Sequence, residues 1–159
     1  MIQRFIITIV LIVCFACLPT IGFGQASDMT SHFMYPFCHA NVFHLLANIL
    51  CLWMLSCPLY IFVCYAIAVL CSFFPCFVSE DTMGCSGILF AIAGISWGRI
   101  HRFKGMCRKC LPFVLITFIL PHVNALIHVY CLLLGYLYGT LGINDWLSEK
   151  DPYNPKFIR

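Results

Sequence analysis

Long apolar runs separated by short polar segments dominate the pattern of this chain. Six runs consist almost wholly of hydrophobic and small residues: 5–23, 40–56, 58–78, 84–98, 111–121 and 122–142. A helix needs roughly 20 apolar residues to cross the ~30 Å hydrocarbon core of a bilayer. The pattern therefore predicts six membrane-spanning helices. The boundary between the last two, around Pro121, is the least sharply defined.

The composition agrees with a membrane protein. Of the 159 residues, 62% are hydrophobic and only 9% are charged, and the mean hydropathy is +0.96. Soluble domains have roughly 25% charged residues, so this chain has too few charges to cover a water-exposed surface. Disordered, collagenous and soluble nucleic-acid-binding proteins are thereby excluded. We predict an all-α polytopic membrane protein in contact with the lipid bilayer, with a membrane domain over 1–143 and a cytoplasmic tail over 144–159.

The positions of the basic residues predict the orientation. The nine Lys and Arg residues precede the first run, lie between the fourth and fifth, or follow the sixth: Arg4; Arg99, Arg102, Lys104, Arg108 and Lys109; Lys150, Lys156 and Arg159. Six spans place all three groups on one side, which the positive-inside rule makes the cytoplasm. Five or seven spans would divide them. We therefore expect a multi-pass protein of a plasma membrane (the inner membrane in a bacterium) with both termini cytoplasmic.

The first run leaves an alternative open, and three other parts of the chain have expected positions or roles. The first run resembles a signal peptide in its flanks, but its apolar stretch is long for one, so we expect a retained helix. The polar segment Gly24–Phe37 is expected on the outer side, along the membrane surface. Arg99–Cys110 is expected to be an inner loop that serves topology, and Trp146 in the tail an interfacial anchor.

The twelve cysteines do not indicate a metal site. Most of them lie inside apolar runs, where free Cys behaves as a small hydrophobic residue. Cys107 and Cys110 form one CxxC pair, whereas a structural zinc site needs four ligands. We predict no metal and no cofactor.

Polar side chains inside the second run are the first candidates for chemistry. His44 and Asn48 are four residues apart and share one helix face, and His39 lies at the mouth of the same helix. Such residues are costly in a membrane and often functional. Interhelical hydrogen bonding explains them equally well when the run is taken alone.

The fourth and sixth runs carry stripes of small residues at helical spacing. The stripes are Gly84, Gly87, Ala91, Gly94 and Gly98, and Cys131, Gly135, Gly139 and Gly142, the second beginning one turn after His128. Small residues allow two helices to approach closely, and such packing would carry His128 towards the fourth helix. Ser86 lies in the first helical turn, where either a nucleophile or an ordinary capping serine is expected.

The polar residues of the three spans are expected at a similar depth in the membrane. The second, fourth and sixth spans run from outside to inside, and His44, Ser86 and His128 all lie within about two turns of the outer end, roughly 3–10 Å deep. The fourth span is only about 22 Å long. Its start can therefore lie below the membrane surface, under a water-filled cavity that hydrolysis would need.

These motifs together resemble the rhomboid intramembrane serine proteases. The resemblance covers roughly Phe33–Gly139 and rests on order, spacing and side of the membrane: His39-x4-His44-x3-Asn48, Gly84-x-Ser86-Gly87, and His128 with Gly135 seven residues later. It implies the minimal six-helix bundle. It also implies that Ser86 is the nucleophile, that His128 is its base, and that His44, Asn48 and the Ser86 N–H stabilise the oxyanion.

The resemblance assigns supporting roles as well. His39 supports the site, Phe90 packs on the catalytic histidine, and Asn124 matches a position that is often polar. Two departures stand out: Cys131 replaces a usual glycine, and the Trp-Arg pair common in the first outer loop is absent from Asp28–Phe33. These put the tightness of packing and the shape of that loop in doubt, but not the chemistry.

The resulting prediction is a serine endopeptidase that cleaves transmembrane segments of membrane proteins near the outer leaflet. No carboxylate lies within any span, so the catalytic pair would be a dyad without an acid. The alternatives are a non-catalytic rhomboid-like protein that binds transmembrane clients, and a haem or metal protein that uses His39, His44 and His128. The sequence predicts neither the substrate nor the oligomeric state.

Overall fold

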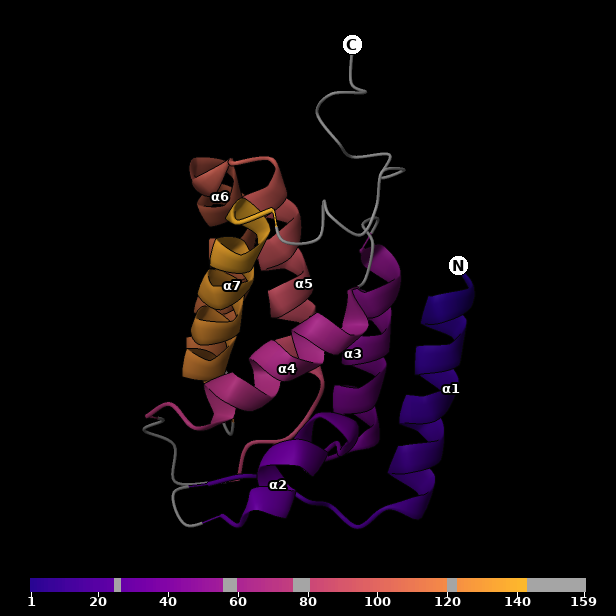
Figure 1. Ribbon diagram of the computed structural model, residues 1–159. Helices are drawn as coiled ribbons and strands as arrows, with labels where there is room; N and C mark the ends of the chain where they lie inside the picture. The colour runs from indigo at the N-terminus through magenta and orange to yellow at the C-terminus, as the bar shows by residue number, and fades with distance from the viewer. Residues whose placement is uncertain (25–26, 56–59, 76–80, 120–122, 143–159) are drawn as a thin grey trace.

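The computed structural model describes residues 1–24, 27–55, 60–75, 81–119 and 123–142. Figure 1 shows a bundle of helices in which α4 crosses obliquely and α1 lies at the edge. The described elements are α1 (Ile2–Cys17), α2 (Met29–Met34), the 3-10 turn η1 (Tyr35–Phe37), α3 (Val42–Met54), α4 (Ile61–Ser72), α5 (Ser86–Arg99), α6 (Phe103–Ile119) and α7 (Ala125–Thr140). The predicted tail and its Trp146 lie outside the described residues.

Six of these helices correspond to the six apolar runs, and the prediction of an all-α fold is confirmed. None of the described helices has by itself both the length and the apolar character needed to cross a membrane. The pair Met29–Phe37 and Val42–Met54 meets that test jointly, but it is bent by 71° at its break.

The prediction that Arg99–Cys110 is a loop was wrong. Helix α6 begins at Phe103, so its first two turns contain Lys104, Arg108, Lys109 and the CxxC pair. Lys and Arg are good helix formers, and their long side chains can extend to a polar boundary while the backbone stays helical. The connection between α5 and α6 is consequently short and includes His101 at φ 50°.

The described part of the segment before α3 forms two short helical elements. It forms α2, capped by the Asp28 carboxylate on the Ser31 N–H, and then η1. His32, Tyr35 and Pro36 are buried. The His32 ring stacks on Phe73 and hydrogen-bonds the Ser72 hydroxyl at 2.8 Å, which ties this segment to the end of α4.

Helix α5 is the centre of the bundle. It contacts α3, α4, α6, α7 and η1, and its contact with α7 is by far the most extensive. Residues Ala91, Ile92 and Ile95 of α5 are completely buried. Because α5 starts at Ser86, the side chains of its first turn belong to the most extensively packed helix of the bundle.

Candidate functional site

Ser86 and His128 are in direct contact. Ser86 is the first residue of α5 and His128 lies in the first turn of α7, with its Nε2 2.8 Å from the Ser86 Oγ. Cys85, not Ser86, is the residue that precedes the helix, and no side chain caps it. The Ser86 hydroxyl is therefore directed at the histidine rather than at the free N–H groups of its own helix.

His128 is held by packing rather than by an acid. Its side chain is only 4% exposed, and the Phe90 ring stacks on it with centroids 4.6 Å apart and an interplanar angle of 24°. Within the described part of the chain, Nδ1 of His128 has no hydrogen-bond partner. The fold thus fixes the imidazole plane through α5 and leaves the second ring nitrogen without an orienting carboxylate.

Gly84 brings helix α3 against the loop before Ser86. Its φ of 110° lies in the region that favours glycine, and an added Cβ would lie 2.7 Å from the His44 ring and 3.5 Å from Nδ2 of Asn48. Only glycine permits this approach. His44 and Asn48, one turn apart on α3, consequently share the surroundings of Ser86.

Asn48 offers an unused donor at this point. Its side chain is 5% exposed, and its Nδ2 has no hydrogen-bond partner among the described residues. A buried, unsatisfied amide is costly and calls for an explanation. A donor waiting for an oxygen that arrives with substrate is one such explanation.

His39 lies behind His44 rather than beside Ser86. It is 1% exposed, and its ring meets that of His44 edge to face, with centroids 5.2 Å apart. It precedes α3, and its ring supports the position of the His44 ring through this contact.

The two small stripes pack against each other between α5 and α7. A Cβ added at Gly94 would clash with the Leu132 carbonyl oxygen, and one at Gly135 or Gly139 would clash with backbone atoms of α5. Gly87 faces the Cys131 sulfur, where its added Cβ would come within 3.2 Å. The packing thus accommodates Cys131, which is fully buried, and holds the histidine at the serine.

Sequence reasoning missed two residues that anchor the loop before Ser86. The Tyr35 carbonyl accepts the Gly84 N–H at 2.9 Å, and the Tyr35 hydroxyl donates to the Ala68 carbonyl. The Thr82 hydroxyl accepts from the Asn124 amide at 2.9 Å, and Asn124 also caps α7. Neither Tyr35 nor Thr82 stands out by spacing, because each is recognisable only once its distant partner is known.

A cavity leads away from the serine. It has a volume of about 320 Å³ and lies between α3, α5 and α6, with Ser86, Asn48 and Phe90 on its wall and Trp97 and Lys109 further along. No group of three His, Cys, Asp or Glu side chains suited to a metal ion occurs in the described part of the chain. The arrangement is thus a hydroxyl, an imidazole and a free amide beside a cavity.

Comparison with known proteins identifies the family of the chain. A family model described as the rhomboid domain matches residues 26–145, which is most of the chain. No curated protein matches the chain. Because the family model extends from the segment before α2 to beyond α7, it includes every element that contributes to the site. The chain belongs to the rhomboid family and is a helical, polytopic integral membrane protein.

Proposed function

We propose that this protein is an intramembrane serine endopeptidase in which Ser86 and His128 form the catalytic dyad. The observation that carries the proposal is the 2.8 Å contact between the Ser86 hydroxyl and Nε2 of a buried His128. The rhomboid family includes intramembrane proteases, and its transmembrane substrates are the class proposed for this chain. The site faces a cavity between helices rather than a soluble cleft.

The proposed reaction is acyl transfer followed by hydrolysis. The Ser86 oxygen attacks a peptide carbonyl carbon while Nε2 of His128 takes the hydroxyl proton. The amine leaves with that proton, and an acyl-enzyme remains. Water then attacks the ester carbonyl while Nε2 of His128 takes a proton from it. The bond between the acyl carbon and the Ser86 oxygen breaks, the proton passes from His128 to that oxygen, and the carboxylic acid product leaves.

The developing oxyanion has candidate donors around it. Nδ2 of Asn48 has no other partner among the described residues, and the His44 ring lies beside Gly84. The Ser86 N–H belongs to the first turn of α5, where N–H groups lack helical acceptors. Preorganised donors of this kind stabilise the transition state because they need no reorientation during the reaction.

The alternative is a non-catalytic rhomboid-like protein that binds transmembrane clients. It would use the same cavity without cleaving anything. The intact pair of Ser86 and His128 favours the protease, because a client-binding protein has no need of a hydroxyl hydrogen-bonded to a buried imidazole.

A fluorophosphonate probe distinguishes the two. Wild type, Ser86→Ala and His128→Ala are purified in mild detergent and treated with the probe, and folding is checked by circular dichroism. We expect a covalent adduct on wild type alone, at Ser86. Folded wild type that forms no adduct would overturn the protease proposal and favour client binding.

We also propose that the end of the bundle carrying the described basic residues faces the cytoplasm of a plasma membrane. The N-terminus, the connection from α5 to α6 and the last turn of α7 all lie toward the upper side of the bundle in Figure 1, and α2 lies at the bottom. Arg4 and the basic residues from Arg99 to Lys109 belong to that end. This supports cleavage near the outer leaflet, where Ser86 would lie.

A further inference from the structure

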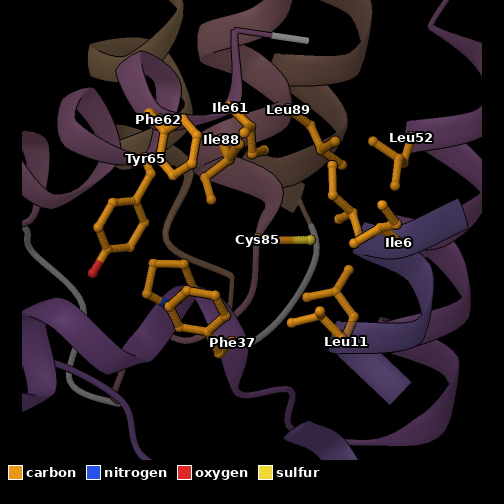
Figure 2. A pocket seen from close by; sticks show the side chains of 13 residues that line it. Ile6, Leu11, Phe37, Leu52, Ile61, Phe62, Tyr65, Cys85, Ile88 and Leu89 are labelled. Carbon is orange, nitrogen blue, oxygen red and sulfur yellow. The ribbon is translucent and has the colours of Figure 1, made fainter. Parts of the chain in front are cut away.

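A second cavity lies on the opposite side of the Ser86 turn. It has a volume of about 470 Å³ and is walled by α1, η1, α3, α4 and the start of α5. Figure 2 shows the Cys85 sulfur directed into it, between Ile6 and Leu11 of α1 and Phe62 and Tyr65 of α4. Leu89 lines this cavity and also the one that contains Ser86, so a single helical turn separates the two.

The lining is apolar almost throughout. The Tyr65 hydroxyl is its main polar group, and that hydroxyl already donates to the Phe33 carbonyl at 2.9 Å. No charged side chain is among the described residues that line the cavity. Water has no partners there, and an apolar cavity of this kind stays dry and accepts apolar guests.

The rim of the cavity is open to the surroundings of the bundle. Phe62 is 86% exposed and Ile6 is 54% exposed, although both line the cavity. In a polytopic membrane protein, the surroundings of exposed apolar side chains on such helices are lipid hydrocarbon. The cavity is therefore open to the lipid of the bilayer.

Size selects a single chain as the occupant. A helix about 10 Å across with a 5.4 Å pitch fills roughly 420 Å³ per turn. A cavity of about 470 Å³ therefore holds only about one turn of a helix, far less than a transmembrane segment of about 20 residues. A flexible hydrocarbon chain needs no polar partner and can enter sideways.

We propose that this cavity binds the acyl chain of a membrane lipid, which packs against Cys85 behind the Ser86 turn. The chain fills a space that the side chains of α1, α4 and α5 leave open. It supports the segment Gly84–Ser86 from the side opposite the serine cavity. A consequence for hydrolysis rests on the proposed protease function, whereas binding of the chain does not.

Photo-crosslinking tests the binding. The full chain is reconstituted in phosphatidylcholine vesicles containing a phosphatidylcholine with a mid-chain diazirine, and illumination converts the diazirine to a carbene that inserts into nearby C–H bonds. Peptide mass spectrometry then locates the adducts. We expect them to be enriched at the buried Cys85 and Ile88 relative to Ile116 and Phe118, which are exposed on α6.

A variant whose cavity is filled by a larger side chain is compared with a variant that carries the same side chain outside the cavity. Ile61→Trp adds bulk inside the cavity from α4, and Leu70→Trp adds the same side chain on an exposed position of that helix outside it. We expect loss of the adducts at Cys85 and Ile88 in the first variant and retention in the second. Ile7→Trp fills the cavity from α1 and serves if Ile61→Trp does not fold.

Two results would overturn the proposal: wild-type adducts distributed evenly over exposed positions, or adducts at Cys85 that persist in a folded, filled variant. Labelling by the fluorophosphonate is measured on the same samples. Enriched lipid adducts without labelling of Ser86 would leave the lipid site standing and reject the protease function, so the two failures are distinguishable.

Discussion

At the scale of single residues, the unused amide of Asn48 is the most informative group. It is buried beside Gly84 and has no protein acceptor in the described part of the chain. A residue kept for folding alone would be expected to satisfy its hydrogen bonds. The free-energy cost of burying this unpaired amide is explained if its acceptor is an oxyanion that forms only during the reaction.

Replacement of this amide should therefore affect turnover more than folding. We expect Asn48→Ala to lower kcat by about 10²–10³, as loss of one oxyanion donor typically does. The measurement is cleavage of a transmembrane substrate in proteoliposomes, with thermal unfolding followed in parallel. Leu50→Ala, at an exposed position of the same helix, is the control. An unchanged kcat in Asn48→Ala would remove this residue from the oxyanion site.

The hydrogen bond between Thr82 and Asn124 gives a second prediction at this scale. Thr82→Val removes the acceptor of a buried amide, and we expect the free energy of unfolding to fall by about 1–3 kcal/mol. Thr82→Ser should restore most of it because the hydroxyl remains. Denaturant unfolding in detergent measures the change, with Thr20→Val, at an exposed position, as the control. Equal stability of Thr82→Val and wild type would show that the bond contributes nothing.

At the scale of elements, the contact between α5 and α7 determines the geometry of the dyad. Ser86 and His128 come from different helices, and glycines allow the backbones of those helices to touch. A separation of the helices would therefore break the contact between hydroxyl and imidazole before it unfolds the bundle.

A single added methyl group tests this dependence. Gly135→Ala places a Cβ against the Ala91 backbone, and such overpacking typically costs about 1–3 kcal/mol. We expect the variant to stay helical by circular dichroism but to lose labelling of Ser86 by the fluorophosphonate. Leu137→Phe adds bulk at an exposed position of α7 and should label like wild type. Full labelling of Gly135→Ala would show that the dyad tolerates a shifted α7.

At the scale of the whole molecule, the arrangement of charges predicts sidedness. Lys104 lies at the basic end of the bundle, and Thr30 lies on α2 at the other end; both are exposed. We expect a membrane-impermeant maleimide to modify Thr30→Cys in intact cells and Lys104→Cys only after permeabilisation. Site-resolved mass spectrometry separates these thiols from the native cysteines. The reverse pattern would invert the proposed topology.

The sequence by itself was sufficient for the class of fold and for the family. Apolar runs and scarce charges depend only on composition and order, so they predict a helical membrane protein without any contact being known. The family resemblance depends on spacing within single segments, and the match of the rhomboid domain over residues 26–145 confirms it. The proposed roles of Ser86, His128, His44 and Asn48 await experiment.

The tertiary structure decided what depends on distant partners. The helical start of α6 contradicts the expectation of a loop, which was drawn from the polarity of that segment. The burial of His32 and Tyr35 was not predicted. The polarity of a segment indicates which surroundings its side chains tolerate. Packing against other elements determines whether the segment is helical and which of its side chains are buried. The links of Tyr35 to Gly84 and of Thr82 to Asn124 join residues more than 40 positions apart, and the cavity behind Cys85 is formed by five elements. No local pattern encodes such contacts, because each exists only after the chain has folded.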